Sequence, residues 1–199
     1  MPYAEWIKTP EFYLSWSQLS MFEERPEDFR RSYIEGQDIG STMYMDFGSR
    51  VAKDFEVGIS ADPGISHAMI FLPEFAKHEH QIIVPCENIR LKAKLDGFDP
   101  KSKRIDELKT ATQPWTQNRV DSFGQLTFYA YCVFLKHKKI PAEIWLHWLE
   151  TQRVGREIKV TGKVKSFETK RTMSDLIKMH SRIMDAYAGI KQLCENGSI

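Results

Sequence analysis

The stretch LKAKLDGFDPKSKRIDELKT, from Leu91 to Thr110, decides the fold. Two short runs of alternating apolar and polar residues flank a turn signal, Asp99-Pro100-Lys101-Ser102. This pattern predicts a β-hairpin with a loop of about four residues. Because successive side chains of a strand point to opposite faces, the alternation also predicts which side chains of the two strands lie together.

Pairing Phe98 with Lys103 gives the expected register of the hairpin. Asp96 then lies opposite Ile105, and Asp96 and Glu107 become diagonal neighbours on one face, with backbones roughly 7–8 Å apart. The polar side chains expected on this face are Arg90, Lys92, Lys94, Asp96, Lys103, Glu107 and Lys109. The apolar side chains expected on the other face are Leu91, Ala93, Leu95 and Leu108.

Two carboxylates at this separation suit one divalent ion. Carboxylate oxygens favour magnesium or manganese, which keep several waters and bind substrate phosphates. Such an ion can acidify a water and neutralise charge on a phosphate, and Lys109 can orient that water or stabilise developing negative charge. Acids and lysines on a hairpin are also typical of a solvated face, and the trio alone leaves both interpretations open.

The pattern Asp96…Glu107-Leu108-Lys109 resembles the signature of the PD-(D/E)xK nuclease superfamily. Three further stretches are similar to its RecB-like exonuclease branch, and the resemblance runs from about Ser15 to Tyr131 in matching order and spacing. They are the opening Ser15–Phe22 (SWSQLSMF) continuing through Pro26, Phe29, Tyr33, Ile34 and Gly36, the helix from Gly48 to Glu56, and a QxxxY motif in Gln125–Tyr129 (QLTFY).

The resemblance implies an α/β fold with a restriction-endonuclease-like core, in which helices flank a central mixed β-sheet. It implies magnesium or manganese held by Asp96, Glu107 and the backbone carbonyl of Leu108. Lys109 would position or polarise the water, and Gln125 would orient the scissile phosphate or the nucleophile. Tyr129 would contact DNA, although packing in the core explains it equally well.

The helix expected from Met43 to about Val57 departs from the family pattern. RecB-like nucleases often have a metal-binding histidine four residues after the position of Gly48, and this chain has Ala52 there. Glu56, one turn further along the same stripe, is expected to supply a carboxylate instead, as phage-type exonucleases of the superfamily do from this helix. An exposed acid at a helix end is the alternative.

The sequence signals for the other expected elements are weaker than those for the hairpin. Ser17 is a plausible N-cap for a helix through about Glu24, and Pro26 fits the first turn of the next. The segment from Ser60 to His80 has little pattern and is expected to be a loop with a turn at 62–64, in which the pair His78 and His80 is more often exposed than metal-binding. A long helix is expected from Pro114 to about Leu135, with Gly124 marking a close approach.

DNA contacts have few candidates outside the motifs. Arg30 lies off the apolar stripe of its predicted helix and is a candidate phosphate contact, although a solvated helix face explains it too. The stretch from Arg153 to Arg171 is the most basic in the chain, and Lys163 and Lys165 lie in its predicted strand. These lysines can follow a phosphate backbone, or they can protect an edge strand from aggregation.

Composition is ordinary for a soluble globular protein, with 199 residues, 42% hydrophobic and 28% charged. We expect one domain over residues 1–199. The net charge of +1 gives no overall attraction for DNA, so binding would depend on local patches. No apolar run approaches the roughly 18 residues of a membrane span, and no secretory signal is recognised at the N-terminus. A cytoplasmic location, in a bacterial or phage-infected cell, is the default expectation.

The three cysteines, Cys86, Cys132 and Cys194, are scattered. Some RecB-like nucleases carry an iron–sulfur cluster, with one cysteine just before the proline of the opening motif and three near the C-terminus. Here Arg25 precedes Pro26, and only Cys194 lies in the last quarter of the chain. No cluster is expected.

The leading hypothesis is a magnesium- or manganese-dependent DNA exonuclease that acts on linear or single-stranded ends in recombination or repair. In this respect the chain resembles the compact nucleases of phages or mobile elements. The main alternative is a catalytically degenerate nuclease fold that binds DNA ends or a recombination partner protein, and Ala52 is its main support. A sequence-specific endonuclease is less attractive, since no recognition insert is evident.

Overall fold

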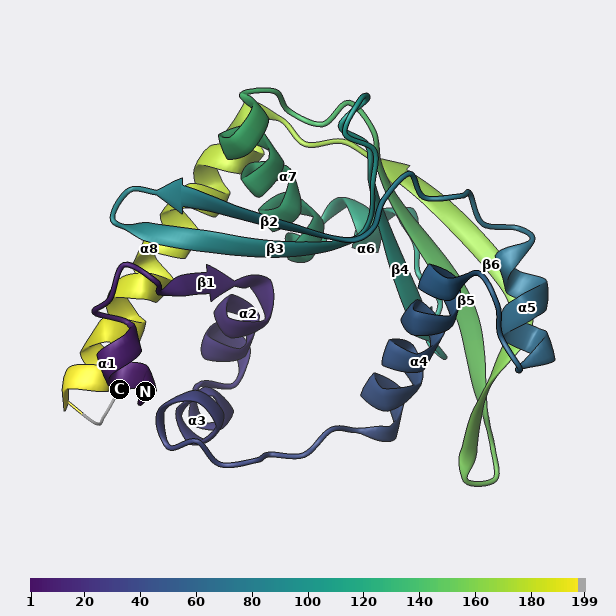
Figure 1. The fold of residues 1–199 in the computed structure, drawn as a ribbon, viewed down its shortest axis with the longest axis horizontal. Coiled ribbons are helices and arrows are strands. Elements are labelled where there is room, and N and C mark those ends of the chain that lie inside the picture. Colours follow the sequence, from purple (N-terminus) through teal and green to yellow (C-terminus); the bar gives the residue numbers. More distant parts are fainter. Residues whose placement is uncertain (197–199) are drawn as a thin grey trace.

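Six strands form one mixed sheet in the computed structural model, which describes residues 1–196 and therefore leaves the last three residues of the expected single domain outside it (Figure 1). The main path of the sheet runs β1-β3-β4-β5-β6, and β2 pairs with the other edge of β3. The strands are β1 (Tyr13–Ser15), β2 (His78–Cys86), β3 (Ile89–Phe98), β4 (Ile105–Ala111), β5 (Ile144–Val154) and β6 (Glu157–Thr169). The β1–β3 and β4–β5 pairs are parallel and the others antiparallel.

Helices flank this sheet, as the sequence predicts. The α7 helix packs on β2, β3 and β4, whereas α4 and α5 lie against β4 and β6. Figure 1 shows that α1 lies beside α8, and that segment 35–42 connects the N-terminal helices to α4. The helices are α1 (Tyr3–Trp6), α2 (Trp16–Glu24), α3 (Pro26–Phe29), the π-helix η1 (Arg30–Ile34), α4 (Met43–Val57), α5 (Pro63–Met69), α6 (Gln117–Asp121), α7 (Gly124–His137) and α8 (Met173–Asn196).

The central hairpin forms, but its predicted register is wrong by two residues. Phe98 pairs with Ile105 rather than with Lys103. The loop is longer because Asp99 organises it: its carboxylate accepts from the Lys101 amide at 2.8 Å and from the Ser102 hydroxyl at 2.7 Å. Lys103 ends this turn with φ at +65°, and so it lies in the loop instead of on the polar face of the hairpin.

The second strand of the hairpin leaves the first almost at once. β3 pairs with β4 only at Gly97 and Phe98, and with β1 at Arg90–Lys92. Residues 93–96 therefore lie between these two partner strands. β4 turns away to run parallel to β5 over its whole length. The polar residues of the hairpin gather beside the stretch of β3 that lies between its pairing with β1 and its pairing with β4.

Two hydrophobic clusters hold these layers. The larger one packs β2, β3 and β5 against α7 and α8, with Leu91, Leu95 and Trp148 buried in it. The smaller one joins Leu108 of β4 to Phe47 of α4 and to α5 and β6. The apolar face predicted for the hairpin is therefore buried, although Leu108 belongs to a different cluster from Leu91.

Several local predictions need correction. The N-cap of α2 is Ser15, not Ser17, because Ser15 and Gln18 form a reciprocal capping box. The segment 60–80 contains α5, in which Asp62 is the N-cap and Pro63 the first residue. The helix predicted from Pro114 begins at Gln117 and is broken between α6 and α7.

Gly124 does mark a close approach. It lies at the start of α7, and a Cβ there would come 2.5 Å from the Trp16 ring and 2.8 Å from an Arg182 nitrogen. Within residues 1–196, no helix is long and apolar enough to cross a membrane.

Gly97 tests the crossing point of the hairpin. An added Cβ would lie 2.6 Å from the Phe75 ring and 2.9 Å from the Asp106 Cβ. We expect Gly97→Ala to lower the free energy of unfolding by about 1–3 kcal/mol, because rigid atoms must move apart. Urea unfolding measures this change. Gly48→Ala, in the α4 helix, is the matched control. An added Cβ at Gly48 would meet only the Thr110 hydroxyl, at 3.4 Å, so this substitution should leave the free energy of unfolding unchanged or raise it. Equal loss in both variants would contradict the packing around Gly97.

Candidate active site

A cleft of about 770 Å³ opens where β4 leaves β3. Its walls come from α4 on one side and α7 on the other, and its floor from β3 and β4. Asp96, Glu107, Leu108 and Lys109 all line it, so the structure brings together the residues that the hairpin pattern predicted. The register error did not matter here, because a slip of two residues keeps every side chain on its face.

Asp96 joins the two diverging strands directly. Its Oδ2 accepts a hydrogen bond from the backbone N–H of Leu108 at 2.8 Å. Glu107 lies beside it, and its Oε1 is 2.5 Å from the Lys109 Nζ. The other oxygen of Glu107, Oε2, is buried and has no hydrogen-bond partner among residues 1–196. The cleft thus holds a buried acceptor that the rest of the protein does not satisfy.

Two carboxylates share one ammonium group in this cleft, so one negative charge is left without a partner when both acids ionise. Burial, followed by repulsion from Asp96, raises the pKa of Glu107 to about 8. Burial also raises the pKa of Asp96, although Lys109 and the Leu108 amide oppose this. An added cation would relieve both effects.

Lys109 stays protonated in this environment. Burial alone would lower the pKa of its ammonium group, but the nearby Glu107 and Asp96 carboxylates outweigh this and raise it. A protonated Lys109 cannot act as a general base. It can hold a water by hydrogen bonding and stabilise negative charge on a phosphate.

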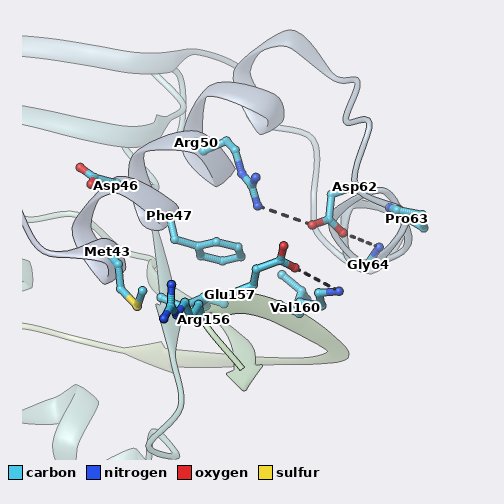
Figure 2. A pocket seen from close by; sticks show the side chains of 12 residues that line it. Met43, Asp46, Phe47, Arg50, Asp62, Pro63, Gly64, Arg156, Glu157 and Val160 are labelled. Atoms are coloured by element: carbon cyan, nitrogen blue, oxygen red, sulfur yellow. Dashed lines mark hydrogen bonds and ion pairs between the residues drawn. The ribbon is translucent and has the colours of Figure 1, made fainter. Parts of the chain in front are cut away.

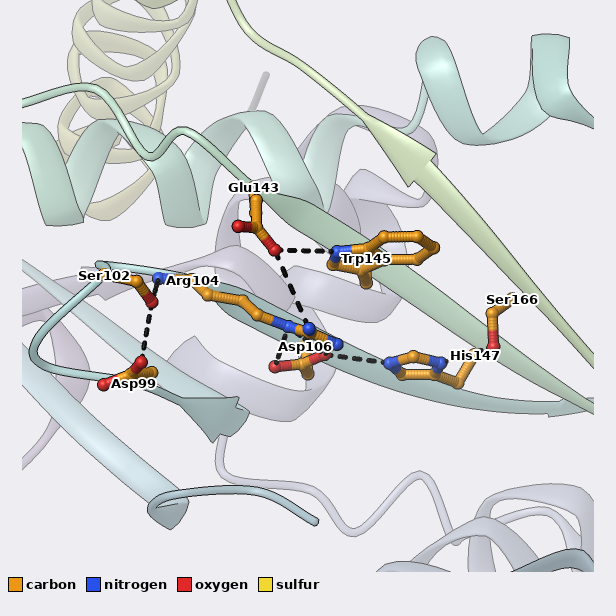
Figure 3. Close-up of polar contacts among 8 residues, drawn as sticks. All are labelled: Asp99, Ser102, Arg104, Asp106, Glu143, Trp145, His147 and Ser166. Atoms are coloured by element: carbon orange, nitrogen blue, oxygen red, sulfur yellow. Dashed lines mark hydrogen bonds and ion pairs between the residues drawn. The ribbon is translucent and has the colours of Figure 1, made fainter. Parts of the chain in front are cut away.

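A polar network on the opposite face fixes β4 in this orientation (Figure 3). Asp106, which alternates with Glu107, accepts from Arg104 at 2.7 Å and from His147 Nε2 at 2.9 Å. The other ring nitrogen of His147 bonds the Ser166 hydroxyl at 2.8 Å. His147 is therefore a buried histidine with both ring nitrogens hydrogen-bonded. Because Asp106 is anchored on one face, Glu107 and Lys109 must face the cleft.

The QxxxY residues lie together on the α7 wall. Gln125 Nε2 donates to the Tyr129 hydroxyl at 2.7 Å, which confirms that the two side chains share a face. Tyr129 is mostly buried, yet both residues line the cleft. Because Gln125 lines the cleft, its amide oxygen can meet a water or ligand there.

The α4 wall contributes Ala52 and Glu56, both at the cleft as predicted. Glu56 is about 3.8 Å from Lys53 and partly exposed. Sequence analysis missed Glu79, which also lines the cleft and pairs with Lys94 of β3. Glu79 has φ at +50° in the first residues of β2. Only the pairing of β2 with β3 brings it here, and nothing local in the sequence indicates that contact.

The donor set fits a divalent cation through two carboxylates. Asp96 and Glu107 supply oxygen ligands, both acids carry raised pKa values, and one oxygen is unsatisfied. Within the described chain, no group of three or more His, Cys, Asp or Glu side chains is arranged to hold a metal ion. Glu56 and Glu79 therefore lie in the walls, outside an assembled ligand set.

Comparisons with known proteins agree with this architecture. No family model matches the sequence, and no curated protein matches it either. Among solved structures, a protein from Eubacterium rectale assigned as an exonuclease superposes with a TM-score of 0.60 at 14% identity, over 94% of this chain and 82% of that one. A phage-related exonuclease from Haemophilus somnus 129PT gives a TM-score of 0.54 at 11% identity, over 100% of this chain and 96% of that one. The chain therefore has an exonuclease-like fold.

The basic residues predicted to contact DNA lie outside the cleft of this nuclease-like fold. Arg30 pairs with Glu27 at 2.9 Å and also with Glu35, so its guanidinium is already engaged. Lys163 and Lys165 are exposed on β6, and Lys163 is 3.2 Å from Glu150. Lys165 is paired in register with Trp148, which is itself paired with Lys109. These two lysines therefore extend the face that carries the cleft.

A second hollow of about 690 Å³ lies between α4, α5 and β6 (Figure 2). Two of its carboxylates are already paired with basic side chains. Asp62 is 3.5 Å from Arg50 and also caps α5, and Glu157 is 3.2 Å from Lys159. This pairing distinguishes the hollow from the cleft of the nuclease-like fold, where a buried carboxylate oxygen has no partner.

Glu107 should make metal-free protein less stable as the pH rises. A glutamate in an unfolded chain ionises near pH 4.3, to within about a unit, whereas the pKa of Glu107 in the folded chain is about 8. The folded state holds the proton more tightly, so the stability this group contributes is present below about pH 4 and lost as the pH rises to 8. Glu107→Gln, unfolded by urea in EDTA, should become progressively more stable than the parent between pH 5 and pH 8. Parallel stability curves would contradict the buried acid.

Asp106 should behave in the opposite way. Burial alone would raise the pKa of Asp106, but the hydrogen bonds from His147 and Arg104 outweigh it and hold the pKa below its usual range. The stability it contributes is present above about pH 4 and lost as the pH falls through the folded pKa. Asp106→Asn should therefore cost about 1.5–3 kcal/mol at pH 7. The difference should shrink below pH 4 in the same urea experiment, and a constant difference would contradict the network.

Proposed function

We propose that this chain is a metal-dependent deoxyribonuclease, an exonuclease that hydrolyses phosphodiester bonds of linear DNA. One observation carries the proposal: Asp96, Glu107 and Lys109 converge in an open cleft with one carboxylate oxygen unsatisfied. The exonuclease-like fold of the neighbours supports it. The motif order from Ser15 to Tyr131 favours the RecB-like branch and a compact enzyme of phage or mobile-element recombination and repair.

Magnesium or manganese would be held by Asp96, Glu107 and the Leu108 carbonyl, with Glu56 of the α4 wall as a further candidate carboxylate. When bound, such an ion lowers the pKa of a water and neutralises charge on a phosphate. No iron–sulfur cluster is part of the proposal.

The protein's own residues would do the positioning. Lys109, kept protonated by Glu107, donates to the attacking water or to the scissile phosphate. Gln125, held by Tyr129, orients the same phosphate from the α7 wall. Asp96 ties β3 to the Leu108 amide, so the two carboxylates keep a fixed separation. Lys163 and Lys165 would carry the DNA backbone along β6.

A DNA-end-binding module without catalysis is the second candidate. It is favoured by Ala52 on the cleft wall and by the lack of a three-ligand cluster in the part of the chain that the structure describes. Such a module would act with a recombination partner protein. The two candidates differ in one property, which is turnover of DNA in the presence of metal.

Cleavage of end-labelled DNA tests the proposal. Linear and circular DNAs, single- and double-stranded, are incubated with magnesium or manganese. We expect the parent protein to degrade linear DNA and to spare circles, and we expect Glu107→Gln and Lys109→Met each to lose at least about 100-fold in rate. Glu56→Gln should lose less, because its carboxylate lies in the wall. Cleavage of circles would indicate an endonuclease instead.

Two controls separate chemistry from folding. Glu157→Gln removes an exposed carboxylate in the second hollow and should leave the rate unchanged. Manganese should raise the melting temperature of the parent but not of Glu107→Gln, because only a folded, intact site binds the ion. Tight DNA binding without cleavage in either metal would favour the end-binding module.

A further inference from the structure

Another cavity, of about 390 Å³ and distinct from the hollow between α4, α5 and β6, adjoins the cleft of the candidate active site. Lys94, Gln125 and Tyr129 line both, so the two spaces adjoin at these three side chains, which come from β3 and α7. The remaining lining of this cavity comes from Lys92 of β3 and from α1, β1, α2 and η1, which lie on the N-terminal side of the cleft. We call this space the aromatic cavity, after the five rings that line it: Trp6, Tyr13, Trp16, Tyr33 and Tyr129.

The lining of the aromatic cavity differs sharply from that of the cleft. Four of its rings are only half-buried, so part of each ring surface is free for contact. Two lysines line it, Lys92 and Lys94, of which Lys94 is paired with Glu79 of the cleft, and no carboxylate is among its described lining residues. The cleft beside it carries four acids. A cavity with rings and cations but no acids suits a ligand that has both flat apolar faces and negative charge.

The rings and the lysines are set for such a ligand. Trp6 and Tyr13 meet edge to face, with ring centroids 4.9 Å apart, so the two rings pack at an angle instead of stacking on each other. The Lys92 ammonium lies 4.5 Å from the Tyr13 ring centre and donates to its hydroxyl at 3.3 Å. Along β3, Lys92, Lys94 and Asp96 follow each other at steps of about 6.6 Å. A polyanion laid along this row would lead from the aromatic cavity to the catalytic carboxylates.

We propose that the aromatic cavity binds an unpaired nucleotide next to the scissile phosphate, with its base against the rings of Trp6, Tyr13 and Tyr33 and its backbone along Lys92 and Lys94. The inference rests on the proposed nuclease function and adds its substrate class. Stacking on aromatic rings is largely independent of base identity, so the site selects single-stranded character rather than sequence. Its volume is at the low end for ligand pockets, which suits one or two nucleotides and excludes a duplex.

Binding of short DNAs to the Glu107→Gln protein in magnesium tests this, because turnover is blocked. The probes are a six-nucleotide thymidine oligomer, an abasic oligomer of the same length and a blunt duplex. We expect Tyr13→Leu to weaken binding of the thymidine oligomer by roughly 5- to 150-fold and to leave the abasic oligomer nearly unchanged. Lys92→Met should weaken both oligomers equally, since it contacts the backbone.

Conservative variants separate binding from folding. Tyr13→Phe keeps the ring and should retain most of the affinity, as should Trp6→Phe, whereas Trp6→Leu should not. Phe71→Leu removes an exposed ring two residues after α5, away from the cavity, and should change nothing. Unchanged melting temperatures exclude a folding defect. The proposal would be overturned if the Glu107→Gln protein, with no substitution in the aromatic cavity, bound the thymidine and abasic oligomers equally well.

The outcome for the cavity is separable from the outcome for catalysis. If base-dependent binding is found but the parent protein cleaves no DNA, the cavity stands and the nuclease proposal fails. If the parent cleaves linear DNA but neither binding nor cleavage depends on bases or on Tyr13, the nuclease proposal stands and the cavity proposal fails.

Discussion

The hydrogen bond from the Leu108 amide to the Asp96 carboxylate is the contact on which the site depends. It forms where β4 has just left β3, after only two paired positions, and it bridges strands that would otherwise have no link at this point. The divergence opens the cleft, and the bond limits how far the strands separate. A continuous hairpin would pair its backbone groups throughout and leave no such opening. The site is therefore a consequence of an interrupted ladder.

The two faces of β4 have opposite electrostatic character. Asp106 on one face is surrounded by donors, so its charge is stabilised and it anchors the strand. Glu107, the next residue along β4, is on the other face. It is buried beside Asp96, and the Lys109 ammonium group is its only ion-pair partner among the described residues. The protein therefore stabilises the strand on one face and accepts an unfavourable charge on the other. A strained, incompletely satisfied group in an otherwise well-bonded region is typical of a functional site.

Sequence patterns predicted which side chains of the hairpin lie together better than they predicted the elements around them. The period of two in β3 and β4 put Asp96, Glu107 and Lys109 together, and this survived a register error of an even number of residues. The error arose because the Asp99 carboxylate shapes the loop through side-chain bonds, which alternation does not encode. Asp62-Pro63 was interpreted as a turn although it is also an N-cap followed by a first-turn proline. Glu79 reaches the cleft through strand pairing alone, so no local pattern could have placed it.

The bond between Asp96 and position 108 has an evolutionary consequence. Its donor is a main-chain amide, so any residue with an N–H can stand at position 108, and only packing in the smaller hydrophobic cluster restricts the choice. A contact made by a main-chain amide does not require a particular side chain, so it restricts the amino-acid sequence very little. Two structures that share only 14% and 11% of their residues with this chain have a similar fold. Shape then remains detectable after sequence comparison has lost the signal.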